Sequence, residues 1–127
     1  MDTELFYINQ QSISLSLMIS DNLRKQNFFN GTRGLTCLLK NLNYIAEYVF
    51  SNEDYNELSE EMQLILPALL EAQNNQDYIL QADILEGDLV PLLQKIQIKF
   101  QESDILRIPD FEDINIGVLK EYLPEFF

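Results

Sequence analysis

Four residue types are scarce or missing from this sequence of 127 residues, which has no histidine, no tryptophan, one cysteine and only four glycines. Without histidine, the chain lacks the commonest general base and the commonest metal ligand. The single cysteine, Cys37, excludes an internal disulfide and a zinc site built from several thiolates of one chain, and it suits a reducing compartment. We therefore expect no metal, no cofactor and no enzymatic activity.

Long apolar stretches are also missing. No apolar run approaches the ~18 residues that suggest a membrane-spanning helix, and no basic segment followed by an apolar one opens the chain. These absences predict a cytoplasmic protein. A chain of 127 residues is long enough for one domain with a single hydrophobic core.

Basic residues are few and unevenly placed. The chain has 21 acidic and 8 basic residues, which gives a net charge of −13. Residues 1–50 hold four acids and four bases, whereas residues 51–75 hold six acids and no base. Because phosphate groups would be repelled, we expect neither nucleic acid nor an anionic membrane as a partner. Two interpretations stay open: an acidic face for a basic protein partner, and an ordinary solvated surface.

The sequence is rich in helical periodicity. Apolar residues recur at intervals of three and four, which predicts four helices at about residues 3–27, 35–50, 53–73 and 77–101. The first segment is ambiguous, because Ser12 to Ser20 alternates polar and apolar residues as a strand does. We favour a helix, since no other segment offers a partner strand. A split, with a second helix capped near Ser20–Asn22, is the alternative.

The stretch from Asn74 to Gln101 has the longest apolar pattern. Its core-facing row consists of Tyr78, Ala82, Leu85, Leu89, Leu92, Ile96 and Phe100. Because this row keeps its phase across Gly87 and Pro91, we predict one kinked helix rather than two. The third helix keeps its rhythm through Pro67, which predicts a second kink. Away from the row lie Leu80, Ile84, Val90 and Ile98. We expect this second apolar side to be buried, either by the C-terminal segment or by a partner.

Turn and cap signals set the other boundaries. Asn30–Gly31 predicts the turn before the second helix. Phe28 continues that helix's apolar rhythm, however, so an earlier start stays open, with this glycine and Gly34 allowing another backbone to come close. Ser51–Asn52, followed by two acids, predicts the start of the third helix. Cys37 lies beside the apolar stripe of the second helix, and we expect a buried, inert thiol.

These segments together predict an all-α protein, an antiparallel four-helix bundle of residues 1–101 with kinked third and fourth helices. We expect residues 102–127 to be an appended C-terminal tail with a short helix near 114–122. The tail is rich in apolar residues, whereas disordered segments seldom contain so many. We expect it to pack on the bundle or on another chain, and a second copy of the protein is one such chain.

Candidate binding residues lie on the two apolar surfaces that have no assigned neighbour. On the fourth helix these are Leu80 and Ile84. In the tail they are Tyr122, Phe126 and Phe127. Aromatic side chains are enriched at protein interfaces, so we predict that these five residues contact a protein partner.

An acidic group on the fourth helix is the nearest approach to a metal site. It consists of Asp83, Glu86 and Asp88, of which Asp83 and Glu86 share a helix face. These acids flank the core-facing row and no histidine accompanies them. We interpret them as a solvated face, or as partners for backbone groups freed near Pro91, rather than as metal ligands.

The segment NNQDYILQADILEGDLVPLL at 74–93 resembles a stretch found in small uncharacterised helical proteins of low-GC Gram-positive bacteria. Some of those proteins accompany flagellar or surface-glycosylation genes. The build is also similar to that of the flagellin-export chaperones, although this likeness is architectural and has no motif behind it. The resemblance implies a bacterial, all-helical cytoplasmic protein, and it supplies no functional residues.

We therefore expect a non-enzymatic protein–protein interaction module, an adaptor or chaperone-like bundle that binds another protein, for instance an amphipathic helix in a groove. A role related to flagellar export is one form of this hypothesis. The alternative is an acidic immunity or antitoxin-type neutraliser, which covers a basic protein by charge complementarity. The third hypothesis is an enzymatic or metal-binding bundle that uses Asp83, Glu86 and Asp88.

Overall fold

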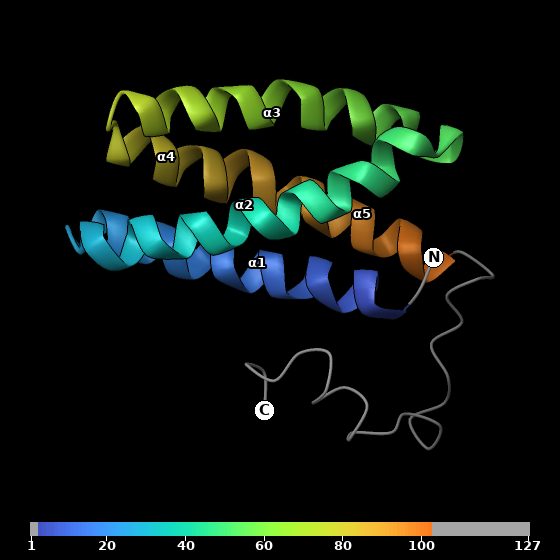
Figure 1. Ribbon diagram of the computed structural model, residues 1–127, viewed down its shortest axis with the longest axis horizontal. Helices are drawn as coiled ribbons and strands as arrows, with labels where there is room; N and C mark the ends of the chain where they lie inside the picture. Colours follow the sequence, from blue (N-terminus) through green and yellow to red (C-terminus); the bar gives the residue numbers. More distant parts are fainter. Residues whose placement is uncertain (1–2, 103–127) are drawn as a thin grey trace, which may run out of the picture.

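The computed structural model describes residues 3–102, which form four antiparallel helices (Figure 1). Helix α1 spans Thr3–Arg24, α2 spans Phe28–Ser51, a 3₁₀ turn (η1) spans Glu53–Tyr55, and α3 spans Asn56–Asn74. The fourth helix consists of α4 (Tyr78–Ile84), a π-turn (η2, Leu85–Leu89) and α5 (Val90–Glu102). The predicted all-α bundle is confirmed. Glu102, the first residue of the predicted tail, is the last residue of α5. The rest of the predicted tail lies outside the described residues, and so do Tyr122, Phe126 and Phe127.

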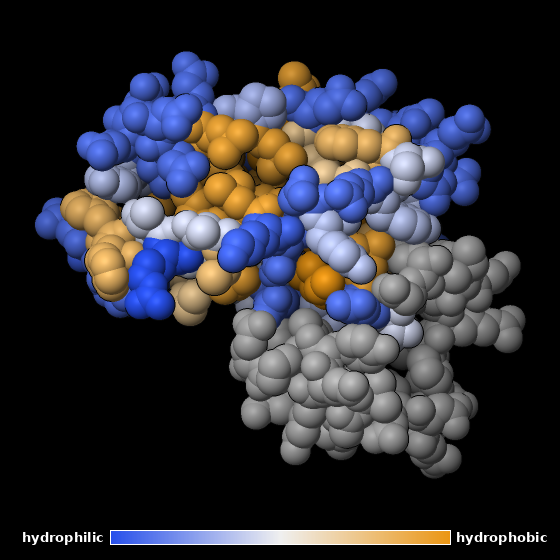
Figure 2. Space-filling view, in the orientation of Figure 1, coloured by the Kyte–Doolittle hydropathy of each residue, from blue (hydrophilic) through white to orange (hydrophobic). Residues whose placement is uncertain are grey.

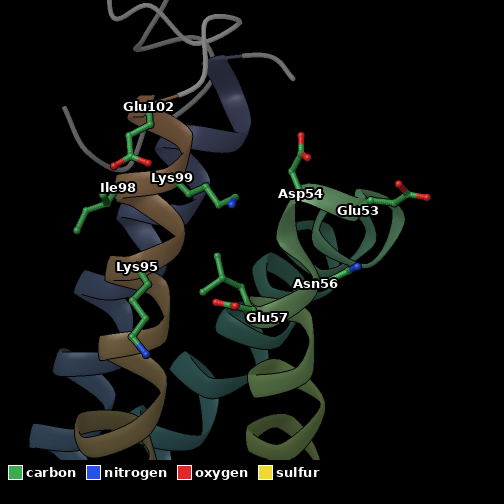
Figure 3. Close-up of a pocket in the computed structure, with 9 residues that line it drawn as sticks. Glu53, Asp54, Asn56, Glu57, Lys95, Ile98, Lys99 and Glu102 are labelled. Atoms are coloured by element: carbon green, nitrogen blue, oxygen red, sulfur yellow. The ribbon is translucent and has the colours of Figure 1, made fainter.

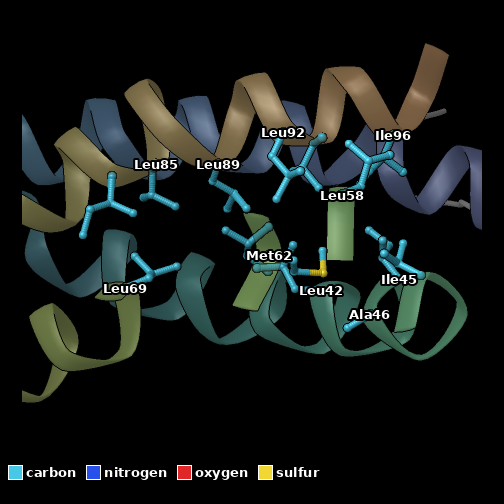
Figure 4. Packing of buried hydrophobic residues seen from close by; sticks show 14 of the residues in the cluster. Leu42, Ile45, Ala46, Leu58, Met62, Leu69, Leu85, Leu89, Leu92 and Ile96 are labelled. Carbon is cyan, nitrogen blue, oxygen red and sulfur yellow. The ribbon is translucent and has the colours of Figure 1, made fainter. Parts of the chain in front are cut away.

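The helices pack in chain order around one core. Helix α1 lies against α2 and against all three parts of the fourth helix, and α3 lies against α2 and the fourth helix. The core-facing row of the fourth helix is fully buried from Ala82 to Phe100, and Tyr78 packs partly buried against the same cluster. Figure 4 shows Leu85, Leu89 and Leu92 pointing from the fourth helix toward Met62 of α3 and Leu42 of α2. This row therefore lies where the helices meet.

The fourth helix is continuous through Gly87 and Pro91, as predicted. The five residues of η2 form a π-turn, in which the amide of Val90 donates to the carbonyl of Leu85 five residues back. Pro91 follows directly and cannot donate to the carbonyl of Gly87. A π-turn adds a residue to the helix without breaking it. Leu85, Leu89 and Leu92 are all at most 1% exposed, so the buried row continues across the π-turn.

Two identical turns connect the antiparallel pairs. Gln26 and Gln76 end α1 and α3 with positive φ angles of 65° and 54°. In the second turn, the amide of Asp77 donates to the carbonyl of Ala72 at 2.9 Å and that of Gln76 donates to Gln73 at 3.1 Å. This is a Schellman motif. The first turn makes the same bonds fifty positions earlier, a structural repeat that the sequence analysis did not detect.

Helix α2 starts at Phe28, so the predicted turn at Asn30–Gly31 is wrong and the earlier start is confirmed. The close approach expected at the two glycines involves side chains of α1. A Cβ atom added to Gly31 would lie 2.6 Å from Cδ2 of Leu23, and one added to Gly34 would lie 2.7 Å from Cγ1 of Ile19. Both glycines therefore let α1 and α2 pack closely.

The alternating segment from Ser12 to Ser20 is helical, and α1 is not split. Its buried serines lie four residues apart, so they share one helix face. Ser12, Ser16 and Ser20 are fully buried, and Asn9 precedes them on the same face. The Asn9 amide donates to the carbonyl of Leu93 at 2.9 Å, and the Ser20 hydroxyl donates to that of Ala82 at 3.4 Å. The polar positions thus face the fourth helix.

The start of α3 follows the predicted signal with one change. The Asn52 side chain accepts a hydrogen bond from the amide of Asp54 at 3.1 Å, but the residues that it caps form the 3₁₀ turn that precedes α3. Helix α3 continues through Pro67. The prediction for Cys37 is wrong in one respect, because the thiol is exposed rather than buried. Cys37 lies on the outer side of α2, beside the buried stripe that contains Leu38.

Candidate protein-binding surfaces

Aromatic and aliphatic side chains gather at one end of the bundle. The N-termini of α2 and α4 lie at this end, opposite the C-terminus of α5 (Figure 1). The rings of Phe28 and Tyr78, the first residues of these two helices, stack with centroids 4.1 Å apart. The residues that follow them in sequence extend the apolar surface. We call Phe28, Phe29, Tyr78, Ile79 and Leu80 the aromatic end cluster.

Most of this cluster is accessible to solvent. Phe29 is 71% exposed, Ile79 55% and Leu80 44%. The guanidinium of Arg33 lies 5.5 Å from the centre of the Phe29 ring, which is within range of a cation–π contact. The carboxylate of Asp77 accepts from the amide of Leu80 at 3.1 Å, and this cap fixes the first turn of α4. The cluster is therefore held by two helix ends rather than by a loop.

The predicted second apolar side of the fourth helix divides into two parts. Leu80 and Ile98 are 44% and 55% exposed, whereas Ile84 and Val90 are each 6% exposed. Ile84 belongs to the hydrophobic core cluster, so its prediction as a partner contact is wrong for the bundle as described. The helix periodicity alone could not show that neighbouring helices cover both sides of α4. Of the predicted pair, Leu80 remains a candidate.

The acidic group at the π-turn is organised by a basic residue of α1. The guanidinium of Arg24 donates to Asp83 at 2.8 Å and to both carboxylate oxygens of Glu86 at 3.2 Å. The buried Ser20 hydroxyl also donates to Glu86. The hydrogen bond from Arg24 lowers the pKa of Glu86 most, and the one from Ser20 lowers it further. The carboxylates of Glu86 and Asp83 in turn raise the pKa of Arg24. Asp88 is exposed.

This arrangement favours an electrostatic clamp between α1 and the π-turn over a metal site. Among residues 3–102, no group of three or more histidine, cysteine or carboxylate side chains is placed to hold a metal ion. The sequence analysis missed Arg24 and Ser20 as partners because they lie about sixty residues away in the chain. The clamp joins α1 and the fourth helix at their accessible edge, next to the aromatic end cluster.

A groove lies at the opposite end, between the start of α3 and the C-terminal half of α5. It has a volume of about 550 Å³, and its apolar lining residues are Leu58 and Ile98. Four carboxylates and two ammonium groups also line it: Glu53, Asp54, Glu57, Glu102, Lys95 and Lys99. Figure 3 shows Lys95 and Lys99 on the α5 side of the groove and Glu57 on the α3 side.

The two lysines of this groove already have partners. Lys95 forms a 2.8 Å ion pair with Glu61 of α3, and the ammonium of Lys99 lies 5.2 Å from the centre of the Tyr55 ring. Burial raises the pKa of the Tyr55 hydroxyl. Within the described part of the chain, Glu53, Asp54 and Glu57 form no ion pair. The groove therefore presents uncompensated negative charge beside an exposed isoleucine.

The outward side of α3 continues this acidic surface. Glu57, Glu60, Leu64 and Glu71 fall on one helix face by their spacing, and all four are exposed. Leu64 is 76% exposed, more than any other large apolar side chain of the described residues. Figure 2 shows hydrophilic residues over α3 and an apolar area between α3 and α2. We call Glu57, Glu60, Leu64 and Glu71 the α3 outer face.

These features define an all-α, four-helix-bundle protein with one aromatic and one acidic surface. The chain belongs to the family described as a domain of unknown function, DUF8042, which matches residues 13–99. This match runs from the middle of α1 almost to the end of α5, so it covers the bundle. No curated protein and no solved structure matches the chain. A search of the described helices finds no segment with the length and apolar character of a membrane span.

Proposed function

We propose that this chain is a non-enzymatic protein-binding module of adaptor or chaperone type, and that it binds its partner through the aromatic end cluster. The observation behind this proposal is the exposure of Phe29, Ile79 and Leu80 on two helix ends that the Phe28–Tyr78 stack holds together. The bundle does not need them for its core, because the buried residues already form one contiguous cluster. Contiguous exposed apolar groups of this kind commonly mark interaction sites.

The chemistry of the cluster fits an apolar anchor of a partner protein. Aromatic side chains and arginine are enriched among the residues that dominate binding energy, and the cluster contains two phenylalanines with Arg33 against one of them. Asp77 and the Phe28–Tyr78 stack fix the geometry of both helix ends before binding. A preformed surface loses little conformational entropy on association.

The test uses the intact protein carrying an affinity tag in its native cell. Phe29→Ser combined with Ile79→Ser removes two exposed apolar side chains without opening the core. We expect each replacement to lower the affinity for a recovered partner about tenfold, as for a typical interface anchor. Leu17→Ser is the matched control, because Leu17 is 49% exposed on α1. Repeated recovery of no partner, or equal binding by all variants, would refute the proposal.

One finer form of this function and one alternative to it are also proposed. Flagellar export is supported by the resemblance of residues 74–93, and unchanged motility after gene deletion would argue against it. Neutralisation of a basic protein is supported by the acid-only stretch of residues 51–75. That form predicts growth rescue when this chain is co-expressed with a basic toxin encoded by a neighbouring gene, and it fails without such a gene or rescue.

A further inference from the structure

We infer that the α3 outer face, together with the adjoining groove, binds a basic amphipathic helix of a partner protein. This inference rests on the chain being a protein-binding module, but it uses a different surface from the aromatic end cluster. The two surfaces share no residue, and the groove lies at the start of α3, whereas the end cluster lies near its last turn (Figure 1). They can therefore be tested separately.

The first argument is uncompensated charge on one helix. Glu57, Glu60 and Glu71 lie on the same face, and residues 51–75 contain no basic residue. The only described cation that forms an ion pair with α3 is Lys95, and it pairs with Glu61. Like charges three or four residues apart disfavour the helix that carries them. The face therefore gains most from a partner that supplies lysine or arginine.

The second argument is the exposed apolar side chains among these acids. Leu64 is 76% exposed in the middle of the α3 outer face, and Ile98 is 55% exposed in the groove. The buried side of α3 is occupied by Leu58, Met62 and Leu69, so Leu64 has no part in the core. An acidic surface with single apolar contact points matches a helix with one basic and one apolar face.

Charge complementarity selects this occupant over the other candidates. A nucleic acid or an anionic membrane would be repelled by carboxylates that line the groove and the helix. An acidic partner would meet the same repulsion. A basic helix, by contrast, places its ammonium groups against Glu57 and Glu60 and an apolar side chain against Leu64. The attraction also speeds encounter and falls with ionic strength.

The probe is a synthetic amphipathic helix of leucine and lysine, about 18 residues or ~27 Å long. Its counterpart, with glutamate in place of lysine, serves as the negative control. Binding to the full chain is measured by isothermal titration calorimetry at low and high salt. Amide chemical-shift changes in nuclear magnetic resonance spectra locate the site. Circular dichroism confirms that each variant is folded.

Two pairs of variants separate this site from general attraction to an acidic protein. Glu57→Gln with Glu60→Gln removes two charges from the α3 outer face, and Glu47→Gln with Asp88→Asn removes two exposed charges elsewhere. We expect the first pair to weaken binding about fivefold, the summed effect of two exposed ion pairs. The second pair should change the dissociation constant less than about twofold.

A matched pair also tests the apolar contact. Leu64→Ser should weaken the leucine–lysine peptide about fivefold or more through lost apolar burial, whereas Leu17→Ser should leave its affinity unchanged. The inference is supported if the losses follow the α3 variants and the shifted amides lie on α3 and at the groove.

Three results would overturn the inference: no binding of the basic peptide, equal weakening by both charge pairs, or shifts centred on the aromatic end cluster. These results are distinguishable from failure of the proposed function. If only the variant with Phe29→Ser and Ile79→Ser fails to bind a cellular partner, the proposed function is supported and the α3 site is refuted. If no cellular partner is recovered but the peptide binds α3, the α3 site is supported and binding through the aromatic end cluster is refuted.

Discussion

Replacing Gly34 with alanine tests the close packing of α1 on α2. The new Cβ would lie 2.7 Å from Cγ1 of Ile19, well inside the ~3.5–4.0 Å of a favourable carbon contact. Ile19 is fully buried, so its side chain has little room to move. Overpacking of this kind costs about 1–3 kcal/mol.

Alanine also brings a gain, because glycine inside a helix is less stable by about 0.5–1 kcal/mol. The two effects oppose each other, and overpacking is the larger. We expect Gly34→Ala to lower the free energy of unfolding by about 0.5–2 kcal/mol. Urea denaturation followed by circular dichroism measures this change.

Gly87 supplies the matched control. It is exposed in the π-turn, its φ is negative, and a Cβ there would meet nothing within 4 Å. Gly87→Ala should therefore raise the free energy of unfolding by about 0.5–1 kcal/mol. A Gly34→Ala protein as stable as the Gly87→Ala protein would refute the close-packing argument. Combining Gly34→Ala with Ile19→Ala should give a less-than-additive loss, because the second change removes the clashing atom.

Three further predictions concern single side chains. Gln76→Gly should raise the free energy of unfolding by about 1 kcal/mol, because Gln76 holds a positive φ that costs residues other than glycine about 1–2 kcal/mol. Gln73→Gly, in the last turn of α3, should lower it, and thermal melts compare the two variants. The lowered pKa of Glu86 means that its stabilisation is present above the unfolded pKa of about 4.3 and is lost as the pH falls through the folded value. Acid titration of stability should accordingly show a weaker pH dependence in Arg24→Gln, and an unchanged profile would contradict the clamp. The exposed thiol of Cys37 should react with a disulfide reagent in the native protein at nearly the rate seen in denaturant, and slow reaction would contradict its exposure.

Much of this fold could be predicted from the sequence, because the spacing of apolar residues along a helix shows which side of the helix is buried. The row from Tyr78 to Phe100 could be read from its spacing, and its continuity across Pro91 could be inferred from its phase. The π-turn itself could not, because nothing local distinguishes an extra residue in the turn from a simple kink. The end of the third helix near Gln73 was predicted, whereas Gln26 was placed inside the first helix. The positive φ angles of Gln26 and Gln76 were missed, since glycine or asparagine usually holds that conformation.

The surfaces were less predictable than the core. Leu80 was placed correctly on an accessible surface, but Ile84 was not, because the neighbours of α4 depend on how the helices pack. Phe28 and Tyr78 meet only when two turns fifty residues apart lie at the same end of the bundle. The Arg24 clamp depends equally on tertiary structure. The α3 acids were visible in the composition, but the exposure of Leu64 among them was not.

Each of the two matching Schellman turns lies near the middle of one half of residues 3–102. Each half is a helical hairpin, with Gln26 at the bend of one and Gln76 at the bend of the other, and Asn52 marks the boundary. A backbone cut at that boundary would leave both hairpins whole, so the halves should reassociate as separate fragments. The halves also differ in charge, because the acidic excess lies entirely after residue 50. One hairpin plan is thus used twice, once with a neutral exterior and once with an acidic one.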